Sequence, residues 1–199
     1  MSDKAAALES IWRGLLGTWR LSRTLQSANS SEPSGTCSGT ATFTMQEPAV
    51  FVDIDGQLQK ASKQLLYTET GEFEMSSNLG LSTPAPKFTF SRKYIWRLQH
   101  YDLSNPEISV WFPKPGTEKV DYLFHKFLIQ SVDQTADRLH IDCSGGHLCV
   151  DDYYSSSYTF CLGHAIGNTV DATLQSWTML HEVRGPKKDQ IIETQFSQI

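Results

Sequence analysis

Hydrophobic and polar residues alternate along most of the chain, which is the pattern of β-strands that have two different faces. The first such run covers residues 17–25, and one of its faces is formed by Trp19, Leu21, Arg23 and Leu25. A helical period precedes it in residues 4–16, where Ala7 or Leu8, Ile11 and Leu15 share one side. Further alternating runs cover residues 36–46, 64–74, 88–98, 108–112, 120–130, 138–143, 153–162, 172–183 and 190–197.

Short turns join these strands, and no helical pattern separates them. Such a chain favours antiparallel up-and-down pairing, and closure into a barrel removes the exposed sheet edges. We therefore predict an all-β antiparallel barrel of about 9–10 strands. The barrel covers residues 17–197 behind a short N-terminal helix over 4–16, and residues 1–199 form one domain. A barrel of this size has room for one small ligand. The proline-containing segment 78–87 is long enough to lie over the mouth of a pocket.

Composition narrows the class of protein. The chain has 199 residues, is 39% hydrophobic and 11% aromatic, and carries a formal net charge of −5. This acidic balance, without a cluster of basic and aromatic residues, argues against a nucleic-acid partner. No stretch approaches the roughly 18 apolar residues that span a membrane, and Asp3 and Glu9 do not fit a signal peptide. We expect a cytoplasmic monomer or homodimer whose four cysteines are reduced.

Two arginines interrupt apolar strand faces. Arg23 shares its face with Trp19, and Arg92 lies on the aromatic face formed by Phe88, Phe90, Tyr94 and Trp96. A buried guanidinium without a partner is costly, so something must compensate each charge. Arg23 either has a structural role, stacking on Trp19 at a barrel end, or belongs to a ligand or catalytic network.

His125 is the leading candidate for proton transfer, because an unperturbed histidine titrates near pH 6.5. On the strand over residues 120–130, His125 shares a face with Asp121, Leu123 and Phe127 and is opposite Tyr122 and Phe124. A hydrogen-bonded structural histidine is the alternative. A shift of one residue in the register would exchange His125 for Phe124.

Residues with metal-ligating side chains lie close together in the segment around His147, Cys149, Asp152 and Tyr154. A single His-x-Cys does not supply the paired ligands of structural zinc, so no metal is predicted. Asp152 is expected to accept hydrogen bonds from backbone amides or from His147, and Tyr154 and Tyr158 to present hydroxyl groups inward. Trp177 and His181 fit the core, with a ligand role as the alternative for His181. Lys187 and Lys188 fit solvated surface charges, although Arg184 or Lys187 could cover Trp19.

The nucleotide-binding, serine-hydrolase and zinc-protease motifs are absent from the sequence, so we expect no tightly bound cofactor.

Several motifs together resemble one protein family. They are Leu16-Gly17-Thr18-Trp19 with Arg23, Tyr94-Ile95-Trp96, Phe124-His125, the run from His147 to Tyr154, Trp177, and Gly185-Pro186-Lys187-Lys188-Asp189. In these the chain resembles the small calycin-like, lipocalin-related β-barrel proteins of filamentous fungi and actinobacteria, some of which are attached to flavin-dependent oxidoreductases. The resemblance implies the barrel fold. Because that family has no settled activity, function must be argued from the site.

These observations predict an aromatic pocket that binds a small hydrophobic or conjugated organic molecule. The first hypothesis is a cofactor-independent enzyme, an isomerase, cyclase or pericyclase acting on a natural-product intermediate. The alternatives are a lipocalin-type carrier and a haem-binding, nitrobindin-like barrel with His125 or His147 as axial ligand. The predicted catalytic residues are His125, Arg23, Tyr94 and Arg92. The predicted binding residues are Trp19, Tyr67, Glu69, Phe88, Phe90, Trp96, Phe127, Tyr154, Tyr158, Trp177, His147 and Asp152.

Overall fold

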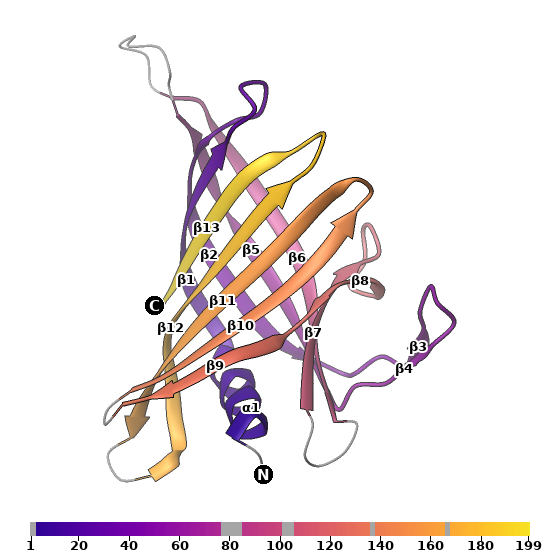
Figure 1. The fold of residues 1–199 in the computed structure, drawn as a ribbon, viewed down its shortest axis with the longest axis vertical. Helices are drawn as coiled ribbons and strands as arrows, with labels where there is room; N and C mark the ends of the chain where they lie inside the picture. Colours follow the sequence, from indigo (N-terminus) through magenta and orange to yellow (C-terminus); the bar gives the residue numbers. More distant parts are fainter. Residues whose placement is uncertain (1–2, 77–84, 101–105, 136–137, 166–167) are drawn as a thin grey trace.

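The computed structural model describes residues 3–76, 85–100, 106–135, 138–165 and 168–199, and it is a nearly closed antiparallel β-barrel with one N-terminal helix (Figure 1). The predicted all-β barrel fold is therefore confirmed. Most of segment 78–87, the predicted cover of the pocket mouth, lies outside the described residues. The helix α1 spans Asp3–Leu15, and no helix in the described ranges is long and apolar enough to cross a membrane.

Eleven strands form the main sheet in the order β8-β7-β6-β5-β2-β1-β13-β12-β11-β10-β9, with every described pair antiparallel. Their bounds are β1 (Gly17–Ser27), β2 (Gly35–Gln46), β5 (Lys63–Met75), β6 (Lys87–His100), β7 (Pro106–Pro113), β8 (Val120–Lys126), β9 (Leu128–Gln134), β10 (Arg138–Cys149), β11 (Asp152–Ala165), β12 (Asn168–Arg184) and β13 (Asp189–Gln198). A separate two-stranded hairpin consists of β3 (Phe51–Val52) and β4 (Leu58–Gln59).

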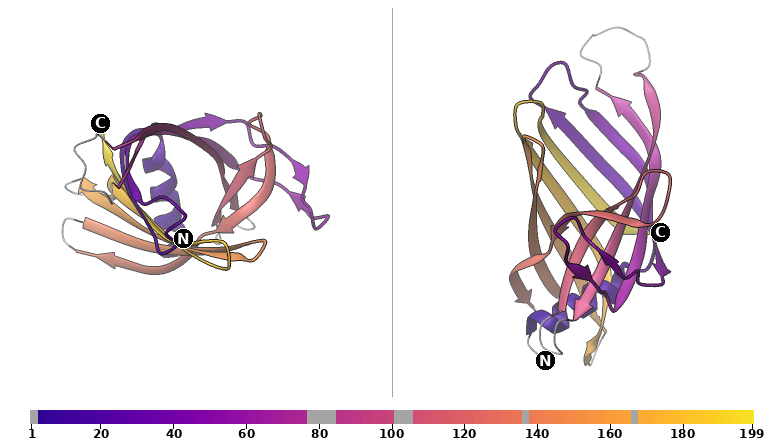
Figure 2. Two further views of the ribbon diagram at one scale, coloured as in Figure 1. Left: turned by 90° about the horizontal axis from the view of Figure 1, so that it is seen from above. Right: turned by 90° about the vertical axis from the view of Figure 1, so that its right-hand side faces the viewer.

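The barrel closes at Phe127. The sequence predicted one strand over residues 120–130, but the chain divides there into β8 and β9, which form the two opposite edges of the sheet. The Phe127 backbone N–H donates to the Ile108 carbonyl of β7 at 2.8 Å, and β8 also packs beside β10. The bent segment thus bonds to β7 with its first half and to β10 with its second, which brings the edges together (Figure 2). Counted as one bent strand, β8 and β9 give a wall of ten strands.

Helix α1 fills one end of the barrel (Figures 1 and 2). Its apolar side chains Ala7, Leu8, Ile11, Trp12 and Leu15 are buried in the same core as the inner faces of the strands. Trp19, the first inward residue of β1, donates from Nε1 to the Leu15 carbonyl at 2.9 Å. Burial of this apolar surface is the main reason why the helix docks.

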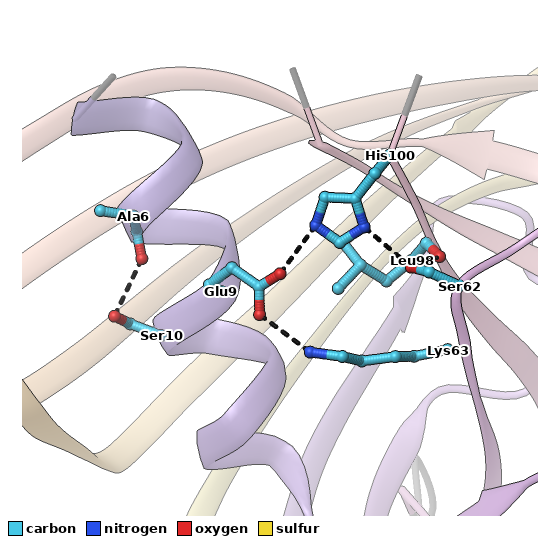
Figure 3. A network of polar contacts seen from close by, with 7 residues as sticks. All are labelled: Ala6, Glu9, Ser10, Ser62, Lys63, Leu98 and His100. Atoms are coloured by element: carbon cyan, nitrogen blue, oxygen red, sulfur yellow. Dashed lines mark hydrogen bonds and ion pairs between the residues drawn. The ribbon is translucent and has the colours of Figure 1, made fainter. Parts of the chain in front are cut away.

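Polar contacts also hold α1 against the wall. Glu9 accepts a hydrogen bond from Lys63 Nζ at 3.1 Å and lies 2.8 Å from His100 Nε2 (Figure 3). His100 in turn contacts the Ser62 hydroxyl at 2.8 Å through Nδ1. Glu9 is half-buried in this network. The network joins the helix to β5 and β6, the strands that carry much of the aromatic core.

Several glycines lie within continuous strands. β5 runs through Gly71, β10 runs through residues 144–146, and β11 runs through Gly163. A Cβ atom on Gly145 would lie 2.4 Å from Cδ2 of His125, and one on Gly71 would lie 2.2 Å from the Ser38 carbonyl oxygen. These positions therefore need glycine because another part of the chain approaches closely, and not because the chain turns.

A second, smaller core lies outside the barrel, where the segment containing β3 and β4 covers the outer face of β6 and β7. Arg97 is fully buried there, with its guanidinium 4.7 Å from the Phe51 ring centroid and 5.9 Å from that of Trp111. One nitrogen donates to the Ala49 carbonyl at 2.7 Å. Its Nε and Nη1 atoms have no hydrogen-bond partner within the described ranges. Burial lowers the pKa of Arg97 to about 10.

A substitution at Arg97 separates packing from charge. We expect Arg97→Met to leave the free energy of unfolding within about 1 kcal/mol of wild type, because methionine keeps the volume and removes unpaired donors. Arg97→Ala should lower it by about 2 kcal/mol or more, since a cavity opens under Phe51. Urea unfolding of both variants measures the difference, and an equal loss in the two would contradict this account.

Candidate functional site

The barrel contains an open cavity of about 850 Å³ at the end opposite α1. Residues from the turn between β1 and β2 and from the turn between β12 and β13 form parts of its rim. Its aromatic wall is built by Phe88, Phe90 and Tyr94 of β6, Phe112 of β7, and Tyr122 and Phe124 of β8. Many of these rings contact one another, as in the Tyr94–Phe124 stack with centroids 5.9 Å apart. The cavity is therefore mostly apolar with polar groups at defined places.

Arg23 and Glu69 form a two-pronged ion pair in the wall of this cavity. Arg23 Nη1 and Nη2 donate to the two Glu69 carboxylate oxygens at 2.9 and 2.7 Å, and its Nε donates to Thr194 Oγ1 at 2.8 Å. The Tyr67 hydroxyl donates to Glu69 at 2.5 Å. This geometry is the strong form of arginine–carboxylate pairing. Arg23 therefore has a charged partner within the protein, and it lies 5.8 Å from the Phe90 centroid and not on Trp19.

The pKa directions agree with this network. Burial alone would lower the pKa of Arg23, but the bonds and charge of Glu69 outweigh it and raise that pKa. Burial, with the negative charge of Glu69, raises the pKa of Tyr67 well above its usual value. At neutral pH the Arg23 guanidinium is therefore charged and the Tyr67 phenol is neutral.

His125 lies in the core beneath the cavity and does not line it. Its Nε2 is 2.8 Å from the Tyr158 hydroxyl, its ring is parallel to that of Phe127, and it is 1% exposed. Its Nδ1 has no partner in the part of the chain that is described. Burial, with smaller contributions from His181 and His147, lowers the pKa of His125 to about 3. At neutral pH His125 is thus an uncharged, enclosed imidazole.

A bulge in β8 explains why His125 was misplaced. The pairing with β7 passes from His125 opposite Val110 to Leu123 opposite Trp111, so Phe124 has no partner of its own. Phe124 lines the cavity and the buried His125 ring packs against Phe124 and Phe127, although neighbouring residues of a regular strand face opposite sides. The expected separation of Phe124 and His125 onto two faces is therefore wrong.

Tyr154 and His147 are paired across β10 and β11, both line the cavity, and their rings lie beside that of Phe124. Lys188 Nζ donates to the Tyr154 hydroxyl at 2.9 Å. Lys188 was expected to be a solvated surface charge; it is half-buried and lines the cavity, whereas Lys187 is exposed. Burial lowers the pKa of His147, which keeps this imidazole neutral at pH 7.

Asp152 holds the turn that carries Lys188. Its Oδ1 accepts hydrogen bonds from the backbone N–H groups of Lys187 at 3.1 Å and Lys188 at 3.3 Å. The prediction that Asp152 accepts bonds from backbone amides is confirmed, and Asp152 does not itself line the cavity. Arg184 pairs with Asp189, and no cation of the described residues lies over Trp19.

The structure divides the predicted site residues by depth. The cavity is lined by Arg23, Glu69, Phe88, Phe90, Arg92, Tyr94, His147 and Tyr154. The core around and below it contains Trp19, Tyr67, Trp96, His125, Phe127, Tyr158 and Trp177. Of the two predicted axial ligands for haem, His147 alone faces the cavity. Sequence reasoning missed Phe112, Tyr122, Phe124, Met179 and Lys188 as lining residues, and His181 was given mainly to the core.

His181 lies in the cavity wall, with Nδ1 2.7 Å from the Ser156 hydroxyl. Burial lowers its pKa to about 4. Among the described residues, no group of three or more histidine, cysteine or acidic side chains is arranged to hold a metal ion. All four cysteines are free thiols.

The model of a protein family of unknown function, DUF6314, matches residues 15–198. The match covers the whole barrel and leaves out nearly all of α1. No curated protein and no solved structure matches the chain.

Proposed function

The chain belongs to the DUF6314 family of unknown function, and we propose that its barrel binds one small hydrophobic or conjugated organic molecule in the open cavity. The observation that carries this proposal is the cavity itself. At about 850 Å³ it falls within the range of sites that enclose organic ligands, and aromatic rings form much of its wall. Binding of a small ligand inside a barrel agrees with the resemblance to calycin-like proteins, and that resemblance stays a prediction.

The polar groups of the cavity would determine how such a molecule is oriented. Tyr94 lines the cavity, and its hydroxyl forms no hydrogen bond with another described residue. Burial, with the charge of Glu69, raises the pKa of Tyr94 to about 12, so the phenol remains a donor at neutral pH. A carbonyl or hydroxyl oxygen on a flat apolar molecule is the partner that such a donor selects.

Catalysis is the second candidate, and the uncommitted Tyr94 donor favours it. We propose that the aromatic walls hold the molecule in a reactive conformation while Tyr94 stabilises charge that develops on its oxygen. An isomerisation, cyclisation or cycloaddition without a cofactor fits this arrangement. His125 is enclosed behind the cavity, so the proposal assigns no direct proton transfer to it. An enzyme and a carrier differ in whether they convert a candidate intermediate. If the barrel is an enzyme, the wild-type chain converts the intermediate, and Tyr94→Phe slows this conversion without weakening binding of the intermediate.

Blocking the cavity tests the binding function directly. Ile192 lines the cavity on β13, and its neighbour Ile191 is similarly half-buried but does not. We expect Ile192→Trp to weaken binding of the neutral dye N-phenyl-1-naphthylamine by about tenfold or more, because the indole occupies the ligand's space. Ile191→Trp carries the same substitution on the other face and should bind the dye as wild type does.

Fluorescence titration gives both affinities, and circular dichroism checks that each variant is folded. Equal dye affinity in the two tryptophan variants, or no binding to the wild-type chain, would contradict the proposed function.

A further inference from the structure

Lys188 is a cation of the cavity that forms no ion pair with a described carboxylate, although the charge of Glu32 acts on it from a greater distance. Lys188 and Arg92 line the cavity with Arg23, and the two carboxylates on its wall are Glu69 and Glu32. Glu69 is engaged by Arg23, and Glu32 accepts from the Gln190 amide. Neither Lys188 nor Arg92 forms an ion pair within the described ranges. The cavity is therefore positively biased in a chain whose formal net charge is −5.

Lys188 is held more firmly than a surface lysine of a turn. The backbone N–H groups of Lys187 and Lys188 donate to Asp152, as described above. Gly185 packs on the same carboxylate, where a Cβ atom would lie 2.2 Å from Asp152 Oδ1. The turn between β12 and β13 is thus clamped to the start of β11, two residues before Tyr154. Arg92, in contrast, is exposed, and its Nη1 donates to the carbonyl of its neighbour Ser91 at 3.2 Å.

The contact between Lys188 and Tyr154 leaves donors for a ligand. The ammonium uses one of its three N–H groups on the phenol oxygen and also lies 5.7 Å from the ring centroid. Because the Tyr154 oxygen accepts from Lys188, its own O–H must be donated elsewhere. The hydrogen bond to Tyr154 raises the pKa of Lys188 against the effect of burial, which keeps the ammonium charged at neutral pH. A phenol beside a fixed cation is a polarised donor.

We propose that Lys188 and Tyr154 form an anion-binding site for a negatively charged oxygen, such as a carboxylate or enolate, on the molecule that occupies the cavity. The ammonium and the phenol O–H both donate to that oxygen, and the rings of Phe112, Tyr122 and Phe124 contact its apolar body. Charge-assisted donors in a partly enclosed site give such a group a strong preference over a neutral one. This inference rests on the proposed function and narrows its ligand to organic anions with a flat apolar body.

Two dyes with the same ring skeleton test the site in the full chain. 8-Anilino-1-naphthalenesulfonate carries a negative oxygen group, and N-phenyl-1-naphthylamine lacks it. We expect Lys188→Met to weaken binding of the sulfonate dye about tenfold, and Tyr154→Phe to weaken its binding by a smaller factor. Neither substitution should change the affinity of the neutral dye by more than about twofold. Lys187 lies in the same turn but is exposed, so Lys187→Met is the matched control and should leave the affinities for both dyes unchanged.

The outcomes separate this site from the binding function. If the wild-type chain binds both dyes and Lys188→Met binds the sulfonate dye as well as Lys187→Met does, the anion site is wrong and the cavity remains a binding site. If Lys188→Met weakens the binding of both dyes equally, the lysine contributes to the shape of the cavity and not to charge recognition. This result also overturns the proposal. If neither dye binds in a way that Ile192→Trp blocks, the proposed function itself fails.

Discussion

Glu69→Gln is expected to lower the free energy of unfolding by about 3–5 kcal/mol, because it removes the countercharge of a buried guanidinium. The Glu69 side chain is 2% exposed and that of Arg23 is 12% exposed, so water compensates the lost carboxylate only in small part. The glutamine also weakens the contacts with Tyr67 and Arg23, which both donate to the present carboxylate. Urea unfolding followed by tryptophan fluorescence measures the change.

The same strand offers a matched control. Glu74 on β5 pairs with Lys87 at 3.1 Å, but both side chains are about half exposed. Glu74→Gln should therefore leave the urea midpoint unchanged, since exposed ion pairs contribute little. The double variant Arg23→Met/Glu69→Met should recover most of the stability lost in Glu69→Gln, because it removes the unpaired charge. A Glu69→Gln variant as stable as the Glu74→Gln control would contradict a buried, essential ion pair.

The second large effect is a loss of stability in mild acid that depends on His125. Its pKa is about 3 in the folded chain against about 6.5 when unfolded, so the unfolded state binds the proton first. The contribution of this histidine is complete above about pH 6.5 and is lost as the pH falls toward 3. Between pH 7 and pH 4 the expected loss is roughly 3 kcal/mol. His181, with a folded pKa of about 4, adds a loss in the same direction.

His125→Gln tests this pH dependence while keeping a polar partner for the Tyr158 hydroxyl. We expect the variant to be less stable than wild type at pH 7, because the glutamine fits poorly between Phe127 and Gly145. The difference should shrink by roughly 3 kcal/mol as the pH falls to 4, since the variant lacks the titrating imidazole. Unfolding curves measured at several pH values give the comparison. Parallel pH dependences for the two proteins would show that His125 is not buried in its neutral form.

Alternation along the strands was sufficient to predict the barrel and the inward face of β1, and the helical period of residues 4–16 predicted the terminal helix. It also showed that Arg23 needs a partner, because a guanidinium stands among Trp19, Leu21 and Leu25. It did not identify Glu69 as that partner, since β1 and β5 are separated in the sheet by β2. The pairing register that brings Glu69 to the same height depends on contacts between distant parts of the chain.

Depth along the barrel is the property that periodicity does not encode. Trp19, Trp96 and Trp177 point inward as expected, yet they fill the half of the barrel nearer α1 and never reach the cavity. The bulge at Phe124 and the division at Phe127 are set by strand closure, for which the local pattern carries no signal. Lys188 was missed for a similar reason, because its inward position depends on Asp152 clamping a turn.

A crystal structure of the chain with bound N-phenyl-1-naphthylamine is the most direct test of the central claim that the open cavity is a ligand site. The account predicts one dye molecule inside the barrel, in contact with Phe90, Tyr94 and Phe124, and above the enclosed ring of His125. A dye found only on the outer surface, for example on the exposed hairpin residues Val52 and Leu58, with side chains filling the cavity, would contradict it.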